Sequence, residues 1–242
     1  MSDRRPVRDE KRGASVAERR AQSLLKVSLS PSFPTGAFAY SHGLEKAVEN
    51  TWVTDRETLE AWLVDLIEVG SLSNDLVLVT ATWQATTRQD WATLRSATAI
   101  AAAMQPSRER ELEATQQGMS FLAQIETAWP YEGATWENVG ADLVAPYPVA
   151  VGYAAARHAI PLVDVLDAFG LAFITNLASA AIRLSVIGQT DGQRIVAALT
   201  PRLLSASESA ARATLDDLGS ATWLSDLASL QHETQHTRLF RS

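Results

Sequence analysis

PLVDVLDAFGLAFITNLASAAIRLSVI, residues 161–187, contains the most apolar part of this chain and decides its fold. Apolar side chains recur through it at helical spacing. Asp167, Asn176 and Arg183 interrupt the apolar run, and a lipid-spanning helix would carry such groups only at high cost. We therefore predict a buried core helix over residues 161–187 and no membrane span.

The segments on either side of this helix also predict helices. Upstream, residues 147–158 form a second apolar helical segment. Downstream, residues 188–194 contain two glycines and predict a turn, from which Asp191 is expected to cap the next helix. We expect that helix to end near Thr200-Pro201, because proline breaks helices, and another helix to cover residues 202–217.

The N-terminal half shows the same helical pattern. Thr54 with Glu57 has the spacing of a capping box and predicts a helix start. The apolar positions that follow it at helical spacing are Leu59, Trp62, Leu63, Leu66 and Ile67. Further helices are predicted over residues 76–83, 90–104 and 107–126, the last with Leu112, Met119, Leu122 and Ile125 as its apolar side. Residues 129–148 hold three prolines and two glycines and predict the main loop.

Composition and sequence pattern indicate the fold class and the domain organisation. The 242 residues are 46% apolar and 20% charged, which suits an ordinary core. Residues 1–20 carry seven basic and four acidic side chains, and we predict a disordered arm there. No period-2 strand pattern or repeat is found, so residues 21–242 are predicted to form one compact, multi-helix, all-α domain.

Charge and cysteine content exclude several functions. The net charge of −7 argues against nucleic acid as a partner. The absence of cysteine excludes disulfides, thiolate metal sites and a cysteine nucleophile. No apolar signal segment follows Arg4 and Arg5, and together with the lack of cysteine this leads us to expect a cytoplasmic protein.

Residues 30–45, SPSFPTGAFAYSHGLE, form the most informative motif for function. The prolines and glycines break helices, yet the segment carries Phe33, Phe38 and Tyr40. Aromatic side chains in such a loop are expected to pack on something. Two interpretations remain open: the loop covers the core of its own domain, or it docks on another protein.

The sequence His232-Glu233-Thr234-Gln235-His236 matches the H-E-x-x-H motif of zinc hydrolases. In that motif both histidines bind zinc and the glutamate acts as the base. A third protein ligand is needed, and none of the six residues after His236 is His, Asp or Glu. A zinc-dependent hydrolase using His232, Glu233 and His236 is therefore the alternative function, and we expect no bound metal, cofactor or catalytic residue.

The order and spacing of four sequence blocks resemble the UreF family of urease accessory proteins, from about residue 24 onwards. The blocks are residues 30–45, the helix around residues 108–122, residues 176–194, and His232-Glu233 with residues 238–242. One departure is His236-Thr237, where the family commonly has a Tyr-Ser pair. A plain helical protein without any link to urease is the remaining alternative.

The resemblance implies a fold and a set of partners. UreF-like proteins are all-α, usually dimeric, and not enzymes. They bind the accessory protein UreD, also called UreH, and the pair recruits the GTPase UreG. The assembly delivers nickel to the urease apoprotein. We therefore expect residues 21–242 to form a UreF-like domain that forms a homodimer and binds UreD/UreH, UreG and urease.

The resemblance also implies a partner-binding surface formed by the loop and the last residues of the chain. The expected members are Tyr40, Ser41, His42, Gly43, Glu45, Arg238, Leu239 and Phe240. Within it, we expect the Tyr40 hydroxyl to contact the Arg238 guanidinium, because arginine offers several fixed donors.

Overall fold

The computed structural model describes residues 15–140 and 142–242, and the elements within these ranges are helices without any strand. The α-helices are α1 (Val16–Ser28), α2 (Leu44–Glu49), α3 (Arg56–Val69), α4 (Ser71–Arg88), α5 (Trp91–Ala103), α6 (Arg108–Ala128), α7 (Trp136–Val139), α8 (Tyr147–Arg157), α9 (Leu162–Arg183), α10 (Gln189–Ala210) and α11 (Trp223–His232). Short 3-10 turns lie at Ala37–Ala39 and Leu215–Asp217. The predicted all-α fold is confirmed.

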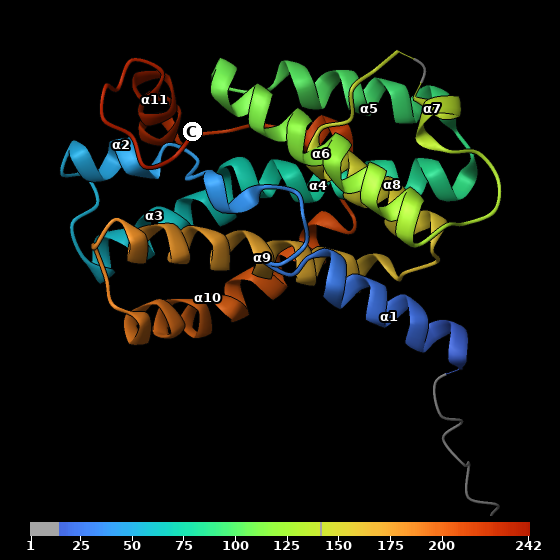
Figure 1. The fold of residues 1–242 in the computed structure, drawn as a ribbon, viewed down its shortest axis with the longest axis horizontal. Coiled ribbons are helices and arrows are strands. Elements are labelled where there is room, and N and C mark those ends of the chain that lie inside the picture. The colour runs from blue at the N-terminus through green and yellow to red at the C-terminus, as the bar shows by residue number, and fades with distance from the viewer. Residues whose placement is uncertain (1–14, 141) are drawn as a thin grey trace, which may run out of the picture.

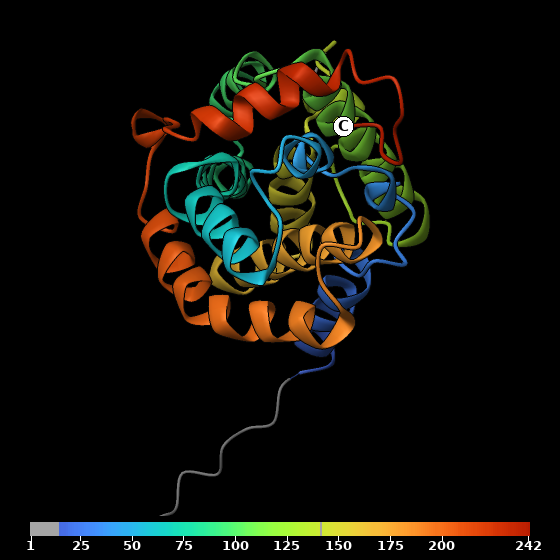
Figure 2. The same ribbon diagram turned by 90° about the vertical axis from the view of Figure 1, so that its left-hand side faces the viewer.

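Helix α4 lies at the centre of the packing. It contacts α8, α5, α3 and α9, while α9 packs along α10 and α6 packs along α8. In Figure 1, α9 and α10 run side by side in the lower part of the molecule, with α1 at the lower right, and α11 lies across α2 at the upper left. Figure 2 shows α11 and α2 in contact on the same side of the molecule.

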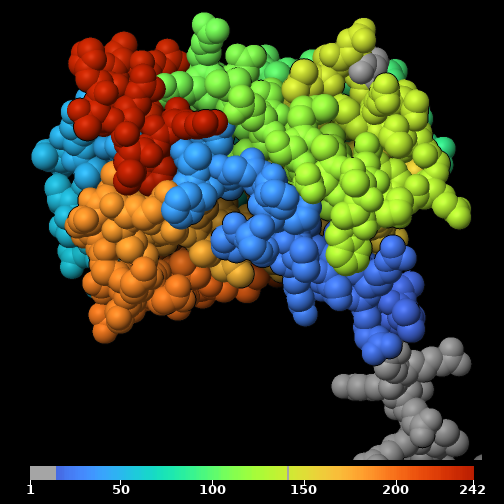
Figure 3. Space-filling model, in the orientation of Figure 1, coloured from blue at the N-terminus to red at the C-terminus, as the bar shows by residue number. Residues whose placement is uncertain are grey.

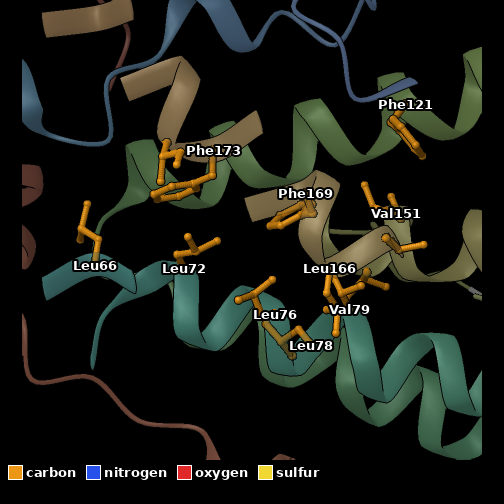
Figure 4. Packing of buried hydrophobic residues seen from close by; sticks show 14 of the residues in the cluster. Leu66, Leu72, Leu76, Leu78, Val79, Phe121, Val151, Leu166, Phe169 and Phe173 are labelled. Carbon is orange, nitrogen blue, oxygen red and sulfur yellow. The ribbon is translucent and has the colours of Figure 1, made fainter. Parts of the chain in front are cut away.

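The core is apolar and continuous through both halves of the chain. Leu76 and Val79 of α4 lie close to Leu166 of α9, and all three are fully or almost fully buried (Figure 4). Helix α9 is long and apolar enough to cross a membrane by length and composition, but about half of it is buried inside the protein. Its apolar stripe packs on α10, α4 and α8, as expected for the predicted core helix.

The N-terminal end of the domain differs from the predicted boundary at residue 20. Helix α1 begins at Val16, because Ser15 caps it: the Ser15 hydroxyl accepts a hydrogen bond from the Glu18 backbone N–H at 3.1 Å. Glu18 returns a bond to the Ser15 N–H and completes a capping box. Residues 1–14 of the predicted arm lie outside the described residues.

Two predicted helix starts are displaced. The N-cap of α3 is Asp55 rather than Thr54, because the Asp55 carboxylate accepts from the Thr58 N–H at 2.9 Å and the Thr58 hydroxyl accepts from the Asp55 N–H. Likewise, α10 starts at Gln189, so Asp191 lies in its first turn and pairs with Arg194 instead of capping.

Helix α10 runs unbroken through Pro201, where the sequence predicted an end and a separate helix over residues 202–217. Ile195 and Leu199 before the proline and Leu203 after it are all buried at four-residue spacing. Burial of this stripe against α9 and α3 outweighs the hydrogen bond that proline cannot donate.

The predicted apolar side of α6 is partly wrong. Leu122 and Ile125 are buried, but Leu112 and Met119 are exposed. The buried face instead carries polar groups, including Arg110, which are paired within the fold. The predicted loop over residues 129–148 is confirmed for the described residues up to 146, apart from the single turn of α7, whereas α8 already begins at Tyr147; residue 141 lies outside the described residues.

Candidate functional site

The loop between α1 and α2, residues 29–43, has a backbone that depends on left-handed conformations. Gly36, His42 and Gly43 have φ angles of 82°, 56° and 76°. Gly43 also lies against α11: a Cβ atom there would come within 2.8 Å of the backbone nitrogen of Ser229. Glycine at 43 therefore allows both the turn into α2 and the close approach of α11.

Residues 238–242, which we call the tail, fold back onto this loop. The Ser41 N–H donates to the main-chain oxygen of Ser242 at 2.7 Å, and the Arg241 N–H donates to the Ala39 carbonyl at 2.8 Å. The Ser41 hydroxyl donates to the same Ser242 oxygen. In Figure 3 the tail and α11, in red, lie against the blue loop on one face of the molecule.

Glu45, in the first turn of α2, holds the tail through its backbone. One carboxylate oxygen accepts from the Leu239 N–H at 2.7 Å and the other from the Phe240 N–H at 2.9 Å. Glu45 is 8% exposed, so these charge-assisted bonds form away from water. The carboxylate thus supplies acceptors for backbone N–H groups that lie outside any helix.

His232 is fully buried between two carboxylates from different helices. Its Nδ1 lies 2.6 Å from a Glu109 oxygen of α6, and its Nε2 lies 3.3 Å from a Glu45 oxygen. Glu109 also pairs with the Arg238 guanidinium. His232 thus connects α11, α6, α2 and the tail in one polar network.

This network overturns the zinc-hydrolase alternative. Both nitrogens of His232 face carboxylates of the fold, and His236 lies beyond the end of α11 rather than one helical turn along it. The Glu233 carboxylate accepts from the Arg108 N–H at 2.7 Å, where α6 begins, and so serves as a helix-terminus acceptor. Among the described residues, no group of three histidine, aspartate or glutamate side chains could hold a metal ion.

The buried side chain of Glu113, on α6, contacts both the loop and the tail. Its carboxylate pairs with Arg110 and accepts hydrogen bonds from His42 at 2.8 Å, Gln117 at 3.0 Å and the Ser242 hydroxyl at 2.5 Å. Burial would raise the pKa of Glu113, but Arg110, His42 and Ser242 outweigh it and lower that pKa to about 2. Glu113 is therefore an anion at neutral pH.

His42 is neutral beside this anion. Burial, followed by the charge of Arg110, lowers its pKa below the usual value despite the opposing effect of Glu113. Its Nε2–H then donates to Glu113, and its ring packs edge-on against Phe173 at 4.9 Å between centroids.

Arg183, at the end of α9, clamps the loop and the tail from the other side. Its guanidinium lies 3.6 Å from the ring centroid of Phe38 and 4.1 Å from that of Phe240. It also donates to the Phe38 carbonyl at 2.6 Å. A cation between two aromatic rings is a favourable contact, and it adds to the direct hydrogen bonds that join the loop and the tail.

The expected contact between Tyr40 and Arg238 is not formed. The Tyr40 hydroxyl donates to the Gln116 side chain at 2.8 Å, whereas Arg238 pairs with Glu109 and donates to the Gln235 carbonyl at 2.7 Å. Geometry explains the difference, because Tyr40 turns inward and is 4% exposed while Arg238 lies on the surface.

The structure brings the predicted loop and tail residues into one region. Tyr40, Ser41, Glu45 and Phe240 are buried in it, while Arg238 and Leu239 are exposed. The sequence reasoning missed the residues that join loop and tail, namely Glu109, Arg110, Glu113, Gln116 and Arg183. The one available signal was the presence of acids four residues apart, Glu109 and Glu113, in a helix whose apolar side looked incomplete.

Helix α11 adds an exposed apolar face beside this region. Trp223, Leu227 and Leu230 recur at helical spacing and are 79%, 42% and 49% exposed. The opposite side of the helix, at Ala228 and His232, is buried. Apolar side chains gathered on one exposed face are typical of a surface that binds protein.

The fold and the site define an all-α protein in which carboxylate side chains bind the protein's own C-terminal tail. Comparison with known proteins places it more closely. The UreF family model matches residues 53–200. Urease accessory protein UreF of Methylobacterium radiotolerans is 49% identical over 216 residues, covering 88% of this chain and 93% of the relative. The same-named proteins of Rhodopseudomonas palustris (BisB5) and Bradyrhizobium diazoefficiens are 47% and 44% identical, covering 88% and 94% of this chain and 88% and 95% of those relatives.

The chain belongs to the UreF family of urease accessory proteins. It is accordingly an accessory protein and not an enzyme. The resemblance found in the four sequence blocks is thus confirmed.

Proposed function

We propose that this chain is the scaffold of a nickel-delivery complex for urease. In this role it binds UreD/UreH, recruits the GTPase UreG, and promotes nickel insertion into apo-urease. Family membership supports a role in urease maturation. We further propose that the protein acts as a homodimer in the cytoplasm, without nucleic acid or membrane as a partner.

One observation carries the partner-binding part of this proposal: the exposed apolar face of α11 lies beside the tail. Leu239 of the tail is 58% exposed, and Trp223 of α11 is 79% exposed. The tail is held by hydrogen bonds to Ser41 and Glu45 rather than by an apolar core of its own. Such a surface can offer large apolar side chains to a protein partner while its backbone stays fixed.

The predicted site residues then divide by task. Ser41, His42, Gly43 and Glu45 position the tail from beneath, and Phe240 anchors it. Arg238 and Leu239 face outward and are the members proposed to contact UreD/UreH or UreG. Tyr40 supports the loop through Gln116.

Replacement of Arg238 tests the surface. Arg238→Ala removes an exposed cation and its pairing with Glu109, and we expect weaker capture of UreD/UreH and UreG with unchanged helical content. Arg202→Ala is the matched control, because Arg202 is an exposed arginine paired with Glu68 on α3, away from the tail. Co-purification of each variant with the partners measures the effect. Normal capture by Arg238→Ala would remove this residue from the proposed surface.

The wider role is tested by urease activation. A host expressing the cognate urease and its other accessory proteins is compared with and without this chain, and the nickel content of urease is measured in parallel. We expect both activity and bound nickel to require the chain. Fully active, nickel-loaded urease in its absence would overturn the proposed function.

A further inference from the structure

A chamber of about 510 Å³ lies beneath the loop that carries the sequence signature. Loop residues from Ser30 to Phe38 line one side of it, and α1, α4, α6, α8 and α9 supply most of the rest. The aromatic side chains on its walls include Phe33, Tyr147, Phe169 and Phe173. The loop therefore covers a space within the domain, and most of that space is bounded by apolar groups.

Asp75 is the unusual group on the lining. It projects from the first turns of α4, and no hydrogen bond or ion pair of its carboxylate is found among the residues that the structure describes. A buried or half-buried carboxylate normally has such a partner, because desolvation of a charge is costly. The partner of Asp75 is thus to be sought in what the chamber contains.

The other charges at this end of the chamber already compensate one another. Arg110 is paired with Glu113, and His42 is a neutral donor to the same carboxylate. Lys26 also lines the chamber, but it lies exposed on α1. This leaves Asp75, among the described residues, as the carboxyl group on the inner part of this lining without a paired partner.

We propose that the chamber binds a small organic cation, a primary amine with an apolar body, whose ammonium pairs with Asp75. The aromatic walls would receive the apolar body, and rings near an ammonium add favourable cation–π contacts. A metal ion fits less well, since no cluster of three metal-ligating side chains occurs within residues 15–140 and 142–242. The proposal is independent of the proposed scaffold function.

Protonation of Asp75 gives the site a pH dependence. Burial raises the pKa of Asp75 to about 7, with Arg110 opposing and Glu113 supporting the shift. An ammonium ligand needs the ionised carboxylate, so its affinity should rise as the pH increases from 6 to 8. Three charged or titratable groups lie around Asp75 on this lining: Arg110 and Glu113 of α6 and His42 of the loop. Glu113, which is paired with Arg110, has its pKa lowered to about 2 and stays ionised over this range, and burial lowers the pKa of His42.

Titration with 2-phenylethylammonium, followed by calorimetry and NMR, tests the site directly. Its uncharged analogue 2-phenylethanol serves as the matched probe. We expect saturable binding of the amine to the wild-type chain, weakened about tenfold or more in Asp75→Asn, because a desolvated ion pair is lost. The alcohol should bind wild type and Asp75→Asn alike. Asp216→Asn, a substitution in the exposed turn at Leu215–Asp217, should leave amine binding unchanged.

A second variant tests the space instead of the charge. Ala172→Phe places a ring in the chamber and keeps Asp75, and it should abolish binding of both probes while circular dichroism stays helical. Equal amine affinity in wild type and Asp75→Asn would overturn the proposal, as would a lack of amine binding to wild type at millimolar concentration. Loss of binding in Asp216→Asn would show that the contact is with surface charge, and would also overturn it.

Discussion

The α4–α9 core and the tail region of this molecule are stabilised by different forces. The core around Leu76 and Leu166 is closed by apolar side chains from several helices. The tail is held by the buried carboxylates of Glu45 and Glu113 and the half-buried carboxylate of Glu109. Apolar burial is non-directional and tolerates exchange of one aliphatic residue for another. Hydrogen bonds to a buried carboxylate require specific donors at specific places, so the tail region is the more easily disrupted by a change of charge.

Truncation of a core residue should have the largest effect. Leu166→Ala removes a fully buried side chain of α9 and should lower the free energy of unfolding by about 2–5 kcal/mol, through lost burial and the cavity left behind. Val163→Ala on the same helix, where Val163 is 46% exposed, should cost far less. Urea unfolding followed by circular dichroism measures both. Similar losses in the two variants would break the distinction between core and surface on α9.

Acidification should act on the tail region before the core. The pKa of Glu113 is lowered to about 2 in the folded protein, so its contribution is fully present above the unfolded value of 4.5 and is lost as the pH falls from there towards 2. The contribution is roughly 3 kcal/mol for a shift of this size. In Glu113→Gln this part of the pH dependence should disappear, whereas Glu111→Gln, an exposed neighbour, should keep it. Stability curves of wild type and Glu113→Gln that run parallel between pH 5 and 2 would contradict the assignment.

Glu45 should show the smallest global and the most local effect. In Glu45→Gln one carboxylate oxygen becomes an NH₂ donor that faces the donors of the tail, so the cost should be about 1–2 kcal/mol and confined to this region. Amide hydrogen exchange should accelerate at Leu239 and Phe240 and stay unchanged in α4 and α9. Glu49→Gln, an exposed residue of the same helix paired with Lys46, is the control. Exchange that accelerates throughout the molecule would mean that tail and core unfold together.

Much of the fold could be predicted because most helices bury apolar residues that recur at helical spacing in the sequence. The core helix α9 was predicted from its composition, and α5 and α6 from their periodicity. The predicted helix boundaries were wrong where two neighbouring residues could each act as the N-cap, as Thr54 and Asp55 could for α3. The predicted helix end at Pro201 was wrong for another reason. Apolar residues on both sides of the proline are buried in the packed fold, and the local sequence pattern does not show that burial.

The sequence predicted many residues of the candidate site, but not the hydrogen bonds and ion pairs that they form. The resemblance placed the loop and the tail together, and the structure does so as well. The predicted contact between Tyr40 and Arg238 was wrong. A contact between positions 198 residues apart depends on which side of the loop faces inward, and the sequence does not show this. Glu109 and Glu113 were missed since acids on a helix usually face water, and only their buried partners Arg110 and His232 reveal another role.

The exposed face of α11 has a practical consequence for spectroscopy. The chain has seven tryptophans. Trp223 is 79% exposed, whereas the other six are buried or half-buried. A soluble quencher such as iodide should therefore reduce chiefly the emission of Trp223. Any protein that covers α11 would protect this fluorophore and shift its emission to shorter wavelength, so the unlabelled chain carries its own optical reporter of assembly.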